Sequence, residues 1–160
     1  MSAPDERVKY VAASIDDIPS IPYEWAPETE WKPLRRYFSI GSFGTNLFRA
    51  PKAGDVLTED HTEDPDSGTR HEELYLVVTG AARFKVDDAE FDAPAGTFVY
   101  VPDPRSVRGA VAGEPGTVLF AVGGEPGCIY TPSEWDREPL PGPTARTADE
   151  PADERPKERE

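Results

Sequence analysis

The sequence predicts an all-β protein, and two observations carry this prediction. Short runs rich in β-branched and aromatic residues follow one another from about residue 37 to residue 131, separated by clusters of glycine, proline and aspartate. No segment keeps the apolar spacing of an amphipathic helix, and the 160 residues include 13 glycines and 18 prolines. Short strands with turns at this spacing are typical of an antiparallel sandwich or barrel.

A length of 160 residues fits one domain with a single core. The predicted strands cover residues 37–40, 45–49, 55 to about 61, 71–79, 82–86, 90–92, 97–101, 106–111 and 117–122, and a short run follows at 128–131. Glycine, proline and aspartate stand at the turns between these runs. We therefore expect a barrel over residues 37–136, with one helical turn near Trp135.

The two ends of the chain differ from this body. Residues 1–36 mix proline, charge and aromatic side chains without a strand or helix period, which predicts an irregular N-terminal arm. Its two tryptophans are expected either to pack on the barrel or to contact a second subunit. Over residues 137–160, proline and alternating charge replace apolar side chains, so a disordered tail is expected.

The run over residues 71–79 is predicted to be the central strand. Side chains two apart on a strand share a face, so His71, Glu73, Tyr75 and Val77 point one way and the residues between them point the other. If the face with the histidine looks into the barrel, it predicts a metal or acid-base site. If the face looks at water, the same residues are a solvated strand end.

Residues 54–122 resemble the cupins, small double-sheet β-barrels whose two motifs are joined by a hairpin. The first cupin motif ends with a glutamate, six residues and a glycine, which Glu73 and Gly80 match. Its two histidines, one residue apart, are replaced here by His61 and Glu63. The resemblance implies a cupin-type double-stranded β-helix, or jelly-roll, barrel of the small single-domain bacterial kind.

The second cupin motif is degenerate in this chain. Gly96 and Pro102 match its first half, whereas Pro104 stands at the second glycine and Val107 at the histidine. Valine cannot bind a metal. The resemblance therefore does not supply a site of three histidines and one glutamate.

A rebuilt metal site is one interpretation of the remaining residues. The only histidines, His61 and His71, together with Glu63 and Glu73 offer two imidazoles and two carboxylates, a set that suits iron, manganese, nickel or zinc. The alternative is a solvated acidic loop over residues 59–66, with His61 exposed and His71 hydrogen-bonded at a strand end.

Four further residues are predicted to line a ligand cavity: Tyr75, Tyr100, Val107 and Arg108. The two tyrosines are expected inside or near the barrel. By the motif Val107 faces inward, which turns Arg108 outward unless the strand bulges. Arg108 is then either a surface partner of the acidic body or a group that holds a ligand carboxylate.

The composition limits the partners. With 17 basic and 31 acidic residues the formal charge is −14, a field that repels phosphate backbones and anionic lipids, so neither nucleic acid nor membrane is expected as a partner. The single cysteine, Cys128, excludes an internal disulfide and is interpreted as a structural thiol. The first residues lack the apolar core of a signal peptide, which predicts a cytoplasmic protein.

Three functions follow from these observations. The first is a barrel that binds a small organic ligand, with or without a divalent metal. The second is a metal-dependent oxygenase or isomerase that uses the rebuilt histidine and glutamate site. The third is a homodimeric scaffold in which the aromatic arm packs on a neighbour.

Overall fold

The computed structural model describes residues 10–64, 69–138 and 140. In chain order its elements are η1 (Ile15–Asp17), β1 (Glu30–Lys32), α1 (Leu34–Phe38), β2 (Gly44–Ala50), β3 (Val56–His61), β4 (Glu72–Thr79), β5 (Ala81–Val86), β6 (Ala89–Pro94), β7 (Phe98–Val101), β8 (Arg108–Ala112), β9 (Thr117–Gly124) and η3 (Glu134–Asp136). The all-β prediction is confirmed. No helix within these residues is both long enough and apolar enough to span a bilayer.

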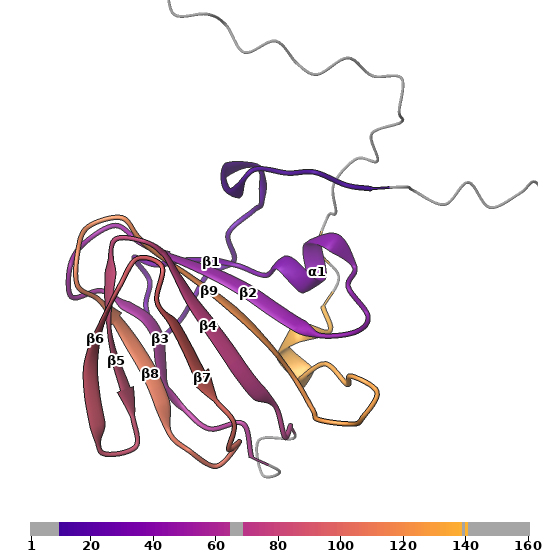
Figure 1. The fold of residues 1–160 in the computed structure, drawn as a ribbon. Coiled ribbons are helices and arrows are strands. Elements are labelled where there is room, and N and C mark those ends of the chain that lie inside the picture. Colours follow the sequence, from indigo (N-terminus) through magenta and orange to yellow (C-terminus); the bar gives the residue numbers. More distant parts are fainter. Residues whose placement is uncertain (1–9, 65–68, 139, 141–160) are drawn as a thin grey trace, which may run out of the picture.

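The described strands form two antiparallel sheets that lie face to face (Figure 1). The larger sheet has the order β1-β2-β9-β4-β7, and the smaller sheet has the order β3-β8-β5-β6. β4 lies between β9 and β7, which agrees with its prediction as a central strand. Its face assignment is also correct, because Tyr75 and Val77 are buried while Val78 is exposed.

The core lies between the sheets, where alternate residues of each strand meet. Tyr75 and Val77 of β4 join Phe84 of β5, Leu57 of β3 and Leu119 of β9 in this cluster. The chain passes from the larger sheet to the smaller one at Gly80, which has φ +71°. A Cβ atom there would lie 2.5 Å from Thr117 Oγ1, so both the turn and the close approach of β9 require glycine.

The strand predicted over residues 37–40 is wrong, because this segment ends helix α1. Ser39 takes the left-handed conformation, with φ 56°, and terminates the helix. The helix is only five residues long, and its arginines reach the segment after β9: Arg35 donates to Asp136, and Arg36 donates to the carbonyl of Glu138. These contacts come from residues about 100 positions away, which a local sequence pattern does not contain.

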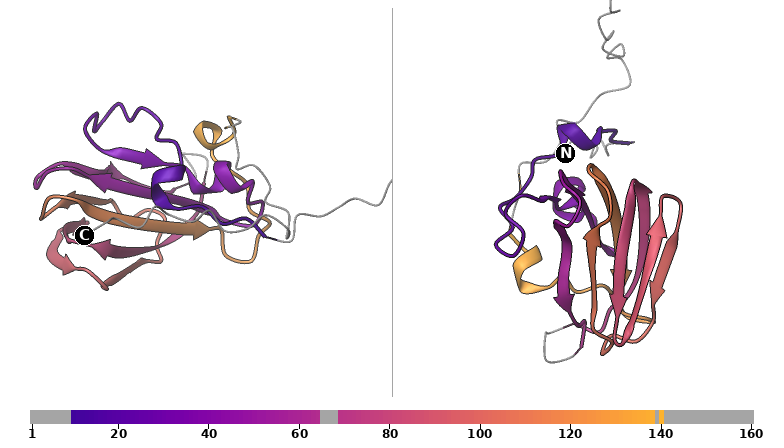
Figure 2. Two further views of the ribbon diagram at one scale, coloured as in Figure 1. Left: turned by 90° about the horizontal axis from the view of Figure 1, so that it is seen from above. Right: turned by 90° about the vertical axis from the view of Figure 1, so that its left-hand side faces the viewer.

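The N-terminal arm contributes a strand that the sequence analysis did not predict. Trp31 pairs with Phe48 in the β1–β2 register, which adds β1 to the edge of the larger sheet. The segment after β9 lies beside this arm (Figure 2), and the rings of Trp31 and Trp135 are 5.5 Å apart. The predicted tail over 137–160 lies almost entirely outside the described residues.

Candidate metal centre and its cavity

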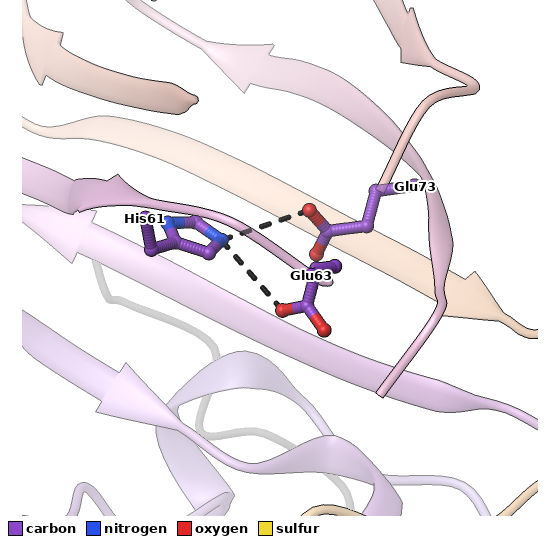
Figure 3. Close-up of side chains that lie close together, drawn as sticks. All are labelled: His61, Glu63 and Glu73. Carbon is purple, nitrogen blue, oxygen red and sulfur yellow. Dashed lines mark ion pairs between the residues drawn. The ribbon is translucent and has the colours of Figure 1, made fainter. Parts of the chain in front are cut away.

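Three side chains converge where the two sheets meet. His61 ends β3 in the smaller sheet, Glu63 follows two residues later, and Glu73 is the second residue of β4 in the larger sheet. His61 Nε2 lies 3.7 Å from Glu73 Oε2 and 3.8 Å from Glu63 Oε1. The imidazole faces both carboxylates (Figure 3), and one ligand atom from each residue lies within 4.8 Å of the others.

His61 is oriented as a metal-binding histidine would be. Its Nδ1 lies 2.8 Å from the carbonyl oxygen of Glu59, which can only accept a hydrogen bond, so Nδ1 carries a proton. In the neutral ring this leaves the Nε2 lone pair directed at the two carboxylates. A backbone carbonyl that fixes the tautomer in this way is the usual support of a metal-ligating histidine.

Glu73 is ionised in this environment. Burial raises the pKa of its carboxyl, but His61, the Tyr75 hydroxyl and the Arg108 guanidinium outweigh that effect and hold the pKa below its usual value. The Tyr75 hydroxyl donates to Glu73 Oε2 at 2.7 Å, and Arg108 Nε lies 3.3 Å from the same oxygen. This carboxylate therefore keeps its negative charge inside the barrel.

The pKa values of Glu63 and His61 are both raised, but by different causes. Burial and the nearby Glu73 charge raise the pKa of Glu63, although Thr69 donates a hydrogen bond to its carboxylate. Burial lowers the pKa of His61, but attraction to Glu73, the Glu59 carbonyl and Glu63 reverses this and raises it to about 9. Without a metal, a proton on His61 Nε2 therefore offsets part of the negative charge of the two carboxylates.

His71 lies outside this group of three. It precedes β4 and is buried, with Nδ1 3.5 Å from Glu63 Oε2. Its ring stacks on Tyr130 at a centroid distance of 5.2 Å. His71 thus contacts Glu63 from the side covered by the segment after β9, and it borders a smaller hollow of about 40 Å³ that Tyr130 also lines. The structure brings together three of the four predicted metal ligands and places the fourth behind them.

The predicted orientation of Val107 and Arg108 is wrong by one residue. Arg108, Ala110 and Ala112 of β8 are buried, as is Gly109 between them, and Arg108 is 0% exposed. Its terminal nitrogens donate to the carbonyl oxygens of Asp103 and Pro104. Val107 is only half-buried and does not line the cavity described below. The arginine therefore occupies the inward place, and neither residue lines the cavity.

The predicted position of the Tyr100 side chain is also wrong. Val99 and Val101 are the buried residues of β7, so Tyr100 lies on the outer face of the larger sheet and is 56% exposed. Its hydroxyl donates to the Glu72 carboxylate across the β4–β7 pair. The alternation of β7 is the reverse of the expected one. Of the four predicted ligand-binding residues, only Tyr75 lines the cavity.

The three converging residues stand at the wall of a cavity of about 560 Å³. Its lining includes six aromatic residues, namely Tyr23, Trp25, Trp31, Phe48, Tyr75 and Trp135. Three of them belong to the arm, whose tryptophans were expected to pack on the barrel or to contact a second subunit, and one belongs to η3, where one helical turn was expected. The concentration of tryptophan in otherwise irregular segments was the signal that could have indicated a binding wall.

Comparison with known proteins shows which solved structures share this architecture. No family model and no curated protein sequence matches the chain. Among solved structures, a cupin protein from Bacteroides fragilis matches with a TM-score of 0.55 and 12% identity, over 82% of this chain and 97% of that one. An RmlC-like cupin from Shewanella frigidimarina gives 0.53 and 16%, over 72% and 91%. The chain has the cupin fold.

A third solved structure is a putative sugar phosphate isomerase from Acidithiobacillus ferrooxidans, with a TM-score of 0.50 and 20% identity over 59% of this chain and 58% of that one. At these identities the likeness concerns the cupin barrel alone. In this cupin barrel the position expected for a motif histidine is Val107, and the inward charge beside it is Arg108. The chemistry of the site therefore depends on the side chains of this chain itself.

Proposed function

We propose that this cupin binds a divalent metal through His61, Glu63 and Glu73 and holds a small organic molecule in the adjoining cavity. The observation that carries the proposal is the convergence of these three side chains within 4.8 Å at the wall of a cavity of about 560 Å³. A cavity of this volume suits a small molecule. The proposal joins the first two functions considered for the sequence, because it assigns a metal to the ligand-binding barrel.

The donor set fits such an ion. Two ligands at about 2.1 Å from a tetrahedral metal lie roughly 3.4 Å from each other. The distances of 3.7 and 3.8 Å from His61 Nε2 to the carboxylates are close to this value and too long for direct hydrogen bonds. One imidazole and two carboxylates suit iron, manganese, zinc or nickel.

The charges support the same conclusion. With His61 neutral, Arg108 balances one of the two carboxylates and leaves the cluster with one net negative charge. Either a proton on His61 or a divalent cation compensates that charge, so proton and metal compete for Nε2. When bound, the ion supplies a Lewis acid that polarises an oxygen atom of the ligand.

Three protein ligands leave further positions of a metal open, which favours a metal-dependent oxygenase or isomerase as the second candidate function. The residues in contact with the site would bind and orient rather than move protons. The Tyr75 hydroxyl contacts the site, but burial and the Glu73 charge raise the pKa of its phenol, and it already donates to Glu73. Tyr75 thus positions that carboxylate.

The sugar phosphate named for one solved neighbour is not carried over to this cupin. Recognition of a phosphate relies on arginine, lysine or backbone donors. Among the described residues, no lysine or arginine lines the cavity, and Arg108 lies behind Glu73 with its donors directed at carbonyl groups.

The first test is metal binding by untagged protein, measured by elemental analysis and by calorimetric titration of Mn²⁺ and Zn²⁺ into chelator-treated protein. We expect one ion per chain, and Glu73→Gln should weaken its affinity at least tenfold, because Glu73 supplies a charged ligand. Glu72→Gln is the matched control. It changes the neighbouring carboxylate, which points to the outer face and bonds Tyr100, and should leave affinity unchanged.

His71→Ala separates a ligand from a supporting residue. Because His71 touches Glu63 from behind, its removal should weaken metal binding without abolishing it. Wild-type protein that takes up neither ion would contradict the metal part of the proposal.

We also propose that the chain forms a homodimer through the outer face of the larger sheet. In the strand register Leu76 stands between Phe98 and Phe120, and Leu74 stands between Tyr100 and Val122. Phe98 is 64% exposed, and this row of six apolar side chains is what favours self-association. We refer to it below as the outer apolar row.

A further inference from the structure

We infer that the ligand of this cavity is a small organic cation, such as a quaternary or protonated amine. The inference rests on the proposed function and deepens it by naming the chemical class that the cavity takes. Two independent features of the lining carry it: an aromatic wall that includes every tryptophan of the chain, and a set of carboxylates with no lysine or arginine beside them among the described residues.

The aromatic wall is held rigidly. Trp31 Nε1 donates to Asn46 Oδ1 at 2.9 Å, and Trp31 pairs with Phe48 in the β1–β2 register. The Tyr23 ring lies 5.9 Å from Trp31 and 6.0 Å from Phe48, and the Tyr23 hydroxyl accepts the backbone N–H of Glu59. These contacts join the arm, β2 and β3. A wall fixed in this way loses little conformational entropy when a ligand binds.

The mouth of the cavity exposes two further tryptophans. Trp25 is 70% exposed and Trp135 is 52% exposed, although each belongs to a segment that packs on the barrel. The chain has three tryptophans in all, and all of them line this one cavity. Indole faces attract cations most strongly among the aromatic side chains. This concentration favours a positively charged ligand over one that needs only an apolar surface.

Apart from His61 at the metal site, the charged side chains that line the cavity are carboxylates. Glu24, Glu59, Glu63 and Glu73 border the cavity, and no lysine or arginine does so within the described residues. The proposed metal uses Glu63 and Glu73. Glu24 and Glu59 remain, and neither forms an ion pair with a lysine or arginine in the described part of the chain. An anionic ligand in this outer part of the cavity would meet Glu24 and Glu59 without a counter-charge, whereas a cation would be attracted by them.

The two ends of the ligand follow from this layout. Its positive group lies among the tryptophans, next to Glu24 and Glu59, and an oxygen atom points toward the three metal ligands at the inner wall. In this orientation the positive group of the ligand is kept away from the positive metal ion. Choline, with a trimethylammonium group and a hydroxyl, has this minimal pattern and serves as the probe.

The experiment compares three molecules of one shape: choline, its neutral isostere 3,3-dimethylbutan-1-ol, and the anion 3,3-dimethylbutanoate. Each is titrated into Mn²⁺-treated wild-type protein, and tryptophan fluorescence is followed. Because every tryptophan lines the cavity, the signal reports on this site. Benzyltrimethylammonium and benzyl alcohol repeat the comparison at a larger size. We expect each cation to bind roughly tenfold more tightly than its neutral partner, and the anion more weakly than both.

Two variants test the assignment by calorimetry. Trp25→Leu and Glu59→Gln should each weaken choline binding about three- to tenfold, and since Trp25 is largely exposed, its replacement leaves the fold intact. Phe43→Leu, at an exposed aromatic residue that does not line the cavity, is the matched control and should change nothing.

The outcomes separate this inference from the proposed function. Metal uptake together with equal or tighter binding of the neutral or anionic probes overturns the cation assignment and leaves the metal-bearing cavity in place. If the protein takes up metal but binds the cation no more tightly than its neutral partner at either probe size, the cation assignment is likewise overturned. Preference for the cation without metal uptake supports the cation site and contradicts the metal part of the proposed function.

Discussion

Arg108 is the residue on which the charge balance of the barrel interior depends. It is completely buried, its Nε lies 3.3 Å from Glu73 Oε2, and its other nitrogens are engaged by the carbonyls of Asp103 and Pro104. Replacing it by methionine keeps much of the side-chain volume but leaves the Glu73 charge in the interior without this partner. We expect Arg108→Met to lower the free energy of unfolding by about 3–5 kcal/mol, measured by urea denaturation of metal-free protein.

Arg105→Met is the control for this prediction. Arg105 pairs with Asp103 at the surface, so its removal should lower the free energy of unfolding far less than Arg108→Met does. The double variant Arg108→Met with Glu73→Gln should recover part of the loss, because the unpaired charge is then absent. A loss at Arg108 no larger than the loss at Arg105 would show that the buried pair does not stabilise the barrel.

The sequence could predict some of these residues and not others. His61, Glu63 and Glu73 share one motif-like stretch, and the match of Glu73 and Gly80 to a cupin pattern located it. Arg108 and Tyr100 were placed on the wrong faces. Alternation along a strand has only two phases, and a shift of one residue exchanges the inner and outer faces. The motif put Val107 inward, whereas the ladder of β8 begins with Arg108 buried.

At the scale of elements, α1 and η3 depend on each other. Arg35 donates through Nε to the Asp136 carboxylate and through a terminal nitrogen to the Asp136 carbonyl, and Asp136 is buried. The Tyr130 hydroxyl also lies 3.4 Å from that carboxylate. This cluster attaches the segment after β9 to the N-terminal side of the barrel, where Trp135 meets Trp31.

We therefore expect Arg35→Met to lower the free energy of unfolding by about 3 kcal/mol, because it leaves the Asp136 carboxylate buried without its cation. The same change should shift the tryptophan emission of the folded protein, since Trp135 loses its support. Denaturation followed by fluorescence and by circular dichroism measures both effects. Arg83→Met is the matched control, because Arg83 makes two exposed ion pairs on the smaller sheet and should change neither readout. Equal effects of the two substitutions would contradict the prediction.

The elements themselves were predictable to different degrees. Strand β4, with its alternating apolar face, and the β5–β6 hairpin, with its Asp87–Asp88 turn, leave a local signature, and the sequence located them. Helix α1 and strand β1 leave none, because α1 is fixed by Asp136 and β1 by its pairing with β2. Tertiary contacts decide the conformation of such short segments.

At the scale of the whole molecule, the outer apolar row is the surface on which the proposed dimer depends. The protein carries a formal charge of −14, so two copies repel each other over most of their surface. The outer apolar row brings uncharged side chains to the centre of one sheet, and a two-fold axis through it would pair each row with its own copy. Self-association would thus bury the apolar row and keep the acidic surfaces apart.

We expect the wild-type protein to have the mass of a dimer in size exclusion with light scattering. Phe98→Asp should shift it to the monomer, because Phe98 is exposed at the edge strand β7 and a carboxylate there would be buried against its symmetry mate. Phe91→Asp, at an exposed aromatic residue on β6 of the smaller sheet, is the control and should leave the dimer intact. Metal affinity should be equal in both variants, because the metal ligands lie on the opposite, inner face of β4 and at the end of β3. A monomeric wild type would exclude the dimer and leave the cavity proposals untouched, since every residue they use belongs to one chain.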